Sequence, residues 1–122
     1  MLEEPDPRRA VALIAANSVA VKQRIGPLLR VIRDASSVDD DSSELWSLIN
    51  TDFHENQKAL VAAIAKRKGL QPGLTVAKAT DLLWTLNHPD VWLLLHDDRG
   101  WSAKEFEKWL AESIRSMLLR ND

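Results

Sequence analysis

The C-terminal segment carries the pattern that most constrains the fold, an apolar repeat with the period of an α-helix. Ser102 is followed three residues later by Glu105, the spacing of a capping box, and Trp101 and Phe106 are placed to form a hydrophobic staple. Residues of one face then recur every three or four positions: Phe106, Trp109, Leu110, Ser113, Ile114, Met117 and Leu118. This pattern predicts an amphipathic helix of about five turns.

Earlier segments have the same spacing and are bounded by helix start and stop signals. A first helix is expected to start at Asp6-Pro7, with a kink or break at Gly26-Pro27, and to fade by residues 35–37. A second is expected from about Glu44 to Lys68, with Asp41 or a neighbouring Ser as its cap and Gly69 as its stop.

Two further helices complete the predicted set. Thr75 is the expected cap of the third, and Pro89 starts a fourth, capped by Asn87 or His88, that stops before Gly100. No segment alternates between apolar and polar residues as a half-buried strand would. The chain of 122 residues has the length of one domain. We therefore expect residues 1–122 to form a single all-α domain, a bundle of about five helices.

Composition narrows the class of protein. The chain is 45% hydrophobic, which is typical of a globular fold, and its formal net charge of −2 gives no general attraction to nucleic acid. It has no Cys, which fits a reducing, cytoplasmic compartment. No apolar run approaches the roughly 20 residues that span a bilayer. We expect no nucleic acid bound by this chain alone and no membrane contact.

Motifs for catalysis or metal binding are weak. The acidic run at residues 39–44 fits helix-start chemistry better than a calcium loop, which needs a Gly and alternating ligands. The three His residues form no helical zinc pair, and His96-Asp97-Asp98 would need further ligands from elsewhere. No nucleophile elbow or phosphate-binding Gly loop is present. We expect no enzyme activity, no metal and no cofactor.

Two other patterns have competing interpretations. The basic residues 66–68 could mark a nucleic-acid patch, but at a helix C-terminus they more often complement the helix dipole. Trp84 with Trp92, and Trp101 with Trp109, could form an aromatic cage for a cation. Tryptophans at such spacing more often anchor a core or an interface.

Residues 82–84 and 91–95 are apolar on nearly every helical face. A helix that is apolar all round must be buried all round, which is difficult in one small domain without a partner chain. We therefore expect a homodimer. Its predicted interface residues are Trp84, Trp92, Leu95, Phe106, Trp109, Leu110, Ser113, Ile114 and Met117.

The second helix mixes polar with apolar residues on its buried side, as the wall of a ligand pocket would. Gln57 lies one turn from Phe53 and so shares its face. A mainly apolar cavity is one expectation, with Gln57 and His88 as its orienting polar groups, and a solid core is the alternative. The predicted pocket residues are Ile14, Val21, Leu28, Trp46, Asn50, Phe53, Gln57, Leu60, Leu83 and His88.

An ordered set of short motifs resembles the C-terminal regulatory domain of the TetR family of bacterial transcriptional repressors. Arg99-Gly100-Trp101-Ser102 followed by Trp109-Leu110-Ala111 is its most specific part. Further pieces, in the family's order, are Asp6-Pro7-Arg8-Arg9, Pro27-Leu28-Leu29-Arg30, Leu45-Trp46, Leu70-Gln71-Pro72-Gly73, Leu82-Leu83-Trp84 and His88-Pro89-Asp90-Val91-Trp92.

This resemblance implies a helical domain whose last two helices form a four-helix bundle in a dimer. It also implies a pocket for a small apolar or aromatic effector that controls DNA binding in a full-length protein. The family's N-terminal helix-turn-helix is expected to be absent, because nothing before Pro7 can form three helices. The alternative is a stand-alone helical dimerisation or protein-interaction module without a ligand pocket.

Overall fold

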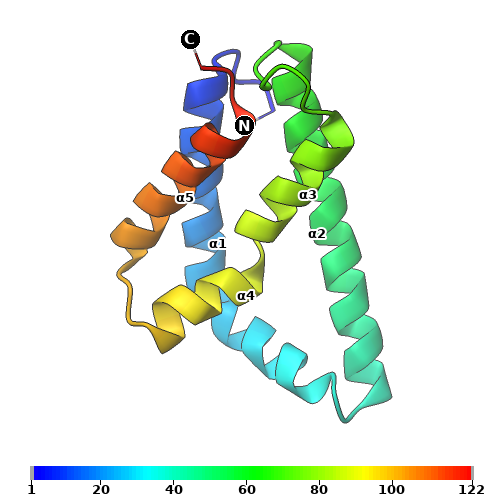
Figure 1. Cartoon of the computed structure of the whole chain (residues 1–122). Coiled ribbons are helices and arrows are strands. Elements are labelled where there is room, and N and C mark those ends of the chain that lie inside the picture. The colour runs from blue at the N-terminus through cyan, green and yellow to red at the C-terminus, as the bar shows by residue number, and fades with distance from the viewer. Residues whose placement is uncertain (1, 122) are drawn as a thin grey trace.

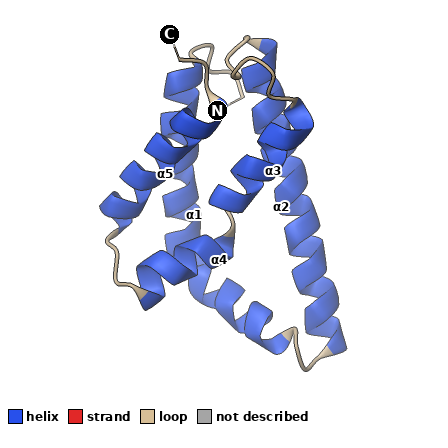
Figure 2. Ribbon diagram, in the orientation of Figure 1, coloured by secondary structure: helices blue, strands red, loops and turns tan. Residues whose placement is uncertain are grey.

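The computed structural model describes residues 2–121, and every regular element in that range is a helix (Figure 2). The elements are α1 (Pro7–Ala35), α2 (Asp40–Lys66), α3 (Val76–Leu86), α4 (Pro89–Trp92), the π-helix η1 (Leu93–Asp98) and α5 (Ala103–Leu118). The predicted all-α fold class is therefore confirmed. No helix within the described range is both long and apolar enough to cross a membrane.

Helices start where the capping residues predict. The side chains of Asp6, Thr75 and His88 each accept a hydrogen bond from a backbone N–H in the first turn of α1, α3 and α4. At α5, Ser102 Oγ accepts from the N–H of Glu105 at 3.1 Å, and Glu105 Oε1 accepts from the N–H of Ser102 at 2.9 Å. The predicted capping box is therefore confirmed.

The predicted start of the second helix was wrong by about a turn. Asp39, rather than Asp41 or a neighbouring Ser, caps α2 by accepting from the N–H of Ser42 at 3.2 Å. The acidic residues that follow it lie in the first turn, where their negative charge interacts favourably with the positive end of the helix dipole. Sequence alone did not identify which acid of the run adopts the extended cap conformation.

Helix α1 runs through Gly26-Pro27 without a break, but Figure 1 shows it changing direction in its second half. Pro27 lies inside the helix, where a proline removes one backbone hydrogen bond and bends the axis. A Cβ atom on Gly26 would lie 3.3 Å from Nε1 of Trp92. Gly26 thus allows α1 and α4 to cross in close contact at this bend.

The end of α2 differs from the predicted glycine stop. Lys68, not Gly69, has the left-handed backbone conformation, with φ of 58°. Gly69 serves a different purpose, because a Cβ atom there would lie within 3.0 Å of both Pro7 and Ile64. The glycine therefore permits the end of α2 to pack against the start of α1.

The core lies between α1, α3 and α5, with α2 packed along α1 and α3 (Figure 1). Its largest fully buried side chains are Phe106, Leu83, Leu110, Ile114, Leu118, Val11 and Val61. Both ends of the described chain lie at one end of the molecule, beside the loop between α2 and α3 (Figure 1). There Leu70 and Leu119 form an isolated antiparallel bridge, flanked by the hydrogen bond from Gln71 N to Leu118 O at 2.8 Å.

Candidate ligand cavity

A partly open cavity of about 700 Å³ lies between α1 and α2. Most of its lining surface is apolar, and the end of α3 closes one side of it. The lining residues are Leu2, Glu3, Ile14, Asn17, Ser18, Val21, Lys22, Phe53, Asn56, Gln57, Ala59, Leu60 and Asn87. Five predicted pocket residues, Ile14, Val21, Phe53, Gln57 and Leu60, are among them.

The floor of the cavity is a buried polar cluster made by three helices, which we call the Lys22 cluster: Ser18, Lys22, Gln57 and Asn87. Lys22 Nζ donates to Ser18 Oγ at 2.7 Å and to Asn87 Oδ1 at 2.9 Å. Ser18 Oγ also donates to Asn87 Oδ1, and Asn87 Nδ2 donates to Gln57 Oε1 at 3.1 Å. One amide at the C-terminus of α3 therefore connects α1 with α2.

Lys22 is the charged member of this cluster, and it is only 2% exposed. Burial lowers its pKa from 10.5 to about 7, because a buried ammonium loses its hydration. Its Nζ atom lies 5.3 Å from the centre of the Phe53 ring, which is close enough for a cation–π interaction. This interaction partly offsets the lost hydration energy. No carboxylate lies within ion-pair distance of Lys22 in residues 2–121.

His88 occupies a second, aromatic cluster beside the cavity. Its ring meets those of Trp46, Phe53 and Trp84 edge-on, at centroid distances of 6.0, 6.5 and 5.1 Å. Nδ1 accepts from the N–H of Asp90 at 3.0 Å, so Nε2 carries the hydrogen and donates to Asn50 Oδ1 at 2.6 Å. Burial lowers the pKa of His88, and the nearby Asp90 carboxylate opposes that shift.

The remaining predicted pocket residues lie elsewhere. Trp46 and Asn50 belong to the His88 cluster, next to the cavity but outside its lining. Leu83 is fully buried in the core, and Leu28 is 59% exposed. Leu28 falls outside because α1 changes direction at Pro27, which turns the last two turns away from the cavity.

Several predicted interface residues face the chain's own core, which corrects that part of the prediction. Phe106, Leu110 and Ile114 are 0% exposed, and Trp92 is 3% exposed, so none of them is free to contact a partner. The face of α5 that carries Phe106, Leu110 and Ile114 packs against α1 instead. The apolar stripe identified a buried face correctly but did not distinguish an internal neighbour from a second chain.

Trp84 also lies away from the expected interface, on the side of α3 that faces α2. Its ring contacts His54 edge-on at 6.0 Å, and it lines a shallow depression of about 310 Å³ with residues of α2. Its Nε1 atom is buried and has no hydrogen-bond partner in the described part of the chain. Trp84 and Trp92 therefore do not form a cage, and Trp101 and Trp109 pack edge-on against each other at 6.0 Å.

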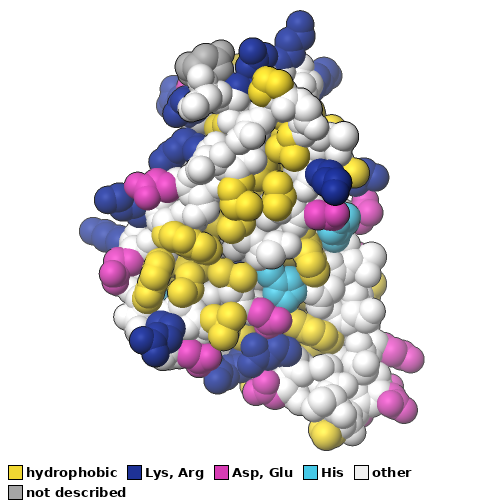
Figure 3. Space-filling view, viewed as in Figure 1, with side chains coloured by type: hydrophobic (Ala, Val, Ile, Leu, Met, Phe, Trp, Pro, Cys, Tyr) yellow, Lys and Arg dark blue, Asp and Glu magenta, His cyan; other side chains and the backbone are white. Residues whose placement is uncertain are grey.

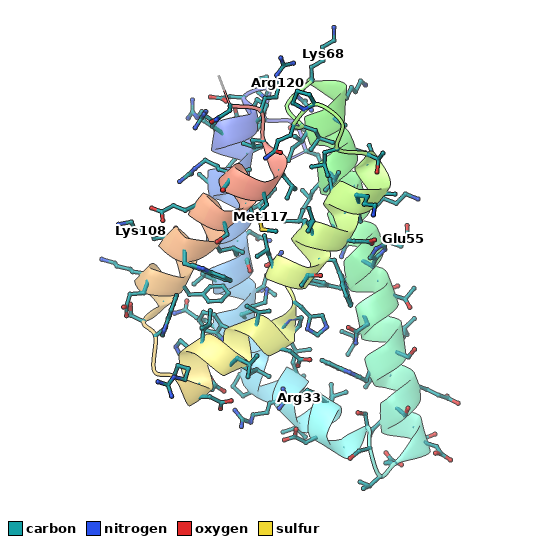
Figure 4. The ribbon with its side chains drawn as sticks, in the orientation of Figure 1. Arg33, Glu55, Lys68, Lys108, Met117 and Arg120 are labelled. Carbon is teal, nitrogen blue, oxygen red and sulfur yellow. The ribbon has the colours of Figure 1, made fainter. Side chains whose placement is uncertain are left out.

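The other predicted interface residues lie on one partly exposed apolar surface. Leu95, Trp109 and Ser113 are partly exposed and Met117 is 40% exposed. With Leu82 and Leu86 of α3, these residues form what we call the α3–α5 face. Figure 3 shows hydrophobic side chains gathered over this region, and Figure 4 shows Met117 between α5 and α3.

The acidic groups that could suggest a metal already have other partners. Arg30 pairs with Asp97 at 3.0 Å and with Asp98 at 3.8 Å, while His96 stacks on Trp92 at 4.2 Å. Within residues 2–121, no group of three or more potential ligands is close enough to hold a metal ion.

The helix ends near the termini carry positive charge. A cavity of about 520 Å³ there is lined by Arg8, Arg115 and Arg120, together with Glu112. Lys68 and Arg120 lie at this end of the molecule in Figure 4. A larger share of its lining is polar than in the cavity between α1 and α2, so it suits an apolar effector less well.

Sequence reasoning missed the Lys22 cluster, although a signal for it exists. Lys22 lies four residues after Ser18, and both continue the buried stripe that starts with Val11 and Ala15. A lysine at a core position of an apolar stripe is rare unless its charge has a purpose. The sequence predicts for Asn87 only a possible role as a helix cap, because its distant partners in α1 and α2 leave no trace in local sequence.

No protein-family model, curated protein or solved structure matches the chain.

Proposed function

We propose that this chain is the effector-sensing and dimerisation domain of a TetR-like transcriptional regulator. The cavity between α1 and α2 is the observation that carries the proposal. Ligand sites in helical proteins lie between helices and combine apolar walls with a few convergent polar groups. The walls supplied by Ile14, Phe53 and Leu60 and the polar floor supplied by Lys22 and Gln57 have this composition.

The position of the cavity offers a route from ligand binding to a change in shape. A ligand there contacts α1, α2 and, through Asn87, the end of α3. It therefore stabilises whichever arrangement of these helices it fits best, and it shifts the population toward that arrangement. In a full-length regulator, the same shift would control DNA binding by a separate domain.

A fluorescent probe, together with a substitution that fills the cavity, tests whether the cavity binds ligands. The neutral fluorophore N-phenyl-1-naphthylamine should bind the unmodified protein, with a rise in emission. Ala59 is exposed and lines the cavity, so Ala59→Trp should fill it and abolish the signal without disturbing the core. The matched control is Ala62→Trp, which lies on α2 outside the lining. Equal binding by both variants would remove the proposed site.

We also propose that the chain forms a homodimer through the α3–α5 face. This surface leaves apolar side chains partly exposed next to one another, as isologous interfaces do. A stable dimer would bury on the order of 1,500 Å² there. Met117→Glu should yield monomers in sedimentation experiments, whereas Leu28→Glu, on an exposed part of α1, should leave the dimer intact. A monomeric unmodified protein at micromolar concentration would contradict the dimer.

The same face supports the second candidate function, a dimerisation or protein-interaction module with no effector. The two candidates differ only at the cavity. Dimerisation without binding of the fluorophore would favour this second candidate.

A further inference from the structure

The ammonium group of Lys22 has two hydrogen-bond partners inside the protein and room for a third. Two of its three N–H groups are donated, to Ser18 Oγ at 2.7 Å and to Asn87 Oδ1 at 2.9 Å, and the third has no hydrogen-bond acceptor among residues 2–121, although Lys22 lines the cavity. Both protein partners are neutral, and neither can balance the charge. A buried ammonium without an anion is unfavourable, and a ligand can supply that anion.

We propose that the cavity binds an apolar monocarboxylic acid, with its carboxylate on Lys22 and its hydrocarbon part against Ile14, Phe53 and Leu60. This inference rests on the proposed function, because it assigns a chemical class to the effector of the same cavity. The carboxylate accepts the remaining N–H of Lys22, and the Gln57 side chain lies beside it on the floor. The acid therefore matches both the charge and the apolar walls.

The charges around the cavity select a single negative charge rather than a phosphate. Among the described residues that line the cavity, Lys22 is the only one with a cationic side chain, and Glu3 is acidic. A doubly charged phosphate would bring more negative charge than one ammonium can neutralise. The other titratable group near Lys22 is His88, whose neutral form is favoured by burial. A monocarboxylate fits this balance best.

Lys22 also responds to its ligand through its own protonation. Burial brings its pKa to about 7, so near neutral pH the amine is partly unprotonated in the empty cavity. A bound carboxylate favours the ammonium form, because opposite charges attract strongly away from water. Binding of the acid is thus expected to take up a proton from solution.

Calorimetry with two probes that differ only in the head group tests the proposal. Octanoate and 1-octanol are titrated into the full chain at pH 7.5. Octanoate should bind at least about tenfold more tightly, the value expected for a charge-assisted hydrogen bond. Lys22→Met should remove this preference, and Lys78→Met, an exposed lysine on α3, should retain it.

A second measurement needs no substitution at Lys22. Octanoate binding in buffers of different ionisation enthalpy should show uptake of part of a proton, and 1-octanol binding should show none. The Glu3→Gln variant should show the same uptake, which separates Lys22 from the carboxylate at the rim.

The outcomes separate this inference from the proposed function. Equal affinity for the two probes, or a preference for octanoate that survives in Lys22→Met, would overturn the carboxylate assignment and leave the cavity as a site for neutral ligands. Absence of binding by both probes would overturn the proposed function as well.

Discussion

Gly69 lies so close to Pro7 that a Cβ atom on it would be 2.7 Å from Cγ of the proline ring. The end of α2 and the start of α1 therefore meet at a position where only a hydrogen atom fits. We predict that Gly69→Ala lowers the free energy of unfolding by about 1–3 kcal/mol through overpacking. Urea denaturation measures this loss, which should shrink in a Pro7→Gly background. The same loss in both backgrounds would rule out this contact as its cause.

A substitution at the neighbouring residue, Lys68, should raise the free energy of unfolding rather than lower it. Lys68 has a positive φ of 58°, a conformation that costs a non-glycine residue about 1 kcal/mol. Lys68→Gly should therefore raise the stability by about 0.5–1 kcal/mol, less any gain in the entropy of the unfolded chain. Lys66→Gly, inside the last turn of α2, serves as the control and should destabilise the protein. A loss of stability in Lys68→Gly would contradict the strain at this position.

The capping box of α5 predicts that replacing Ser102 by alanine lowers the stability of the protein, whereas replacing Ser116 does not. Ser102→Ala removes the acceptor of the Glu105 N–H and should cost about 1 kcal/mol in thermal or urea unfolding. Ser116→Ala, at an exposed position inside α5, should be neutral or slightly stabilising, because alanine favours the helix interior. Equal effects of the two substitutions would argue against the cap.

Lys22 predicts a pH dependence of stability. Its pKa is about 7 in the folded chain and near 10.5 when unfolded, so between these values the unfolded state binds more protons. The free energy of unfolding should therefore rise with pH in this window, by up to about 1.4 kcal/mol per unit. Below pH 7 both states are protonated, and the dependence from this group disappears.

The Lys22→Met variant isolates that contribution from other titrating groups. Its stability relative to the unmodified protein should be greatest near pH 6 and should decline as the pH rises toward 9. A difference that stays constant with pH would show that Lys22 keeps an ordinary pKa. The chemical shift of its Nζ atom provides a direct check by NMR titration.

The sequence predicted the helices well because the information for them is local. Asp6, Thr75 and Ser102 each cap a helix through a backbone group two or three residues away. The site was predicted only in part, because its key contacts join distant segments. Asn87 reaches Lys22 across 65 residues and Gln57 across 30, and no periodicity records such pairings.

The face of α5 shows the same limit in another way. The apolar stripe on Phe106 and Leu110 requires burial but does not specify the neighbour that provides it. In the structure that neighbour is α1, and the adjacent strip with Trp109 and Met117 is the part left partly exposed. Helical periodicity fixes such faces only to within about one residue, or 100° of rotation.

The π-helix η1 contains one residue more than an α-helical turn in its place would, and the neighbouring helices still pack normally. The N–H of Arg99 bonds to the carbonyl of Leu94 five residues back, so this turn holds one residue more than an α-turn. Leu94 is 56% exposed, while Trp92 and Leu93 before it remain buried. Deleting Leu94 would restore an ordinary turn and leave the flanking faces in place. Deletion of one residue within α2 would instead rotate every later residue of that helix by about 100° relative to the helices that pack against it. Natural variation in chain length should therefore be tolerated in η1 and excluded from α2.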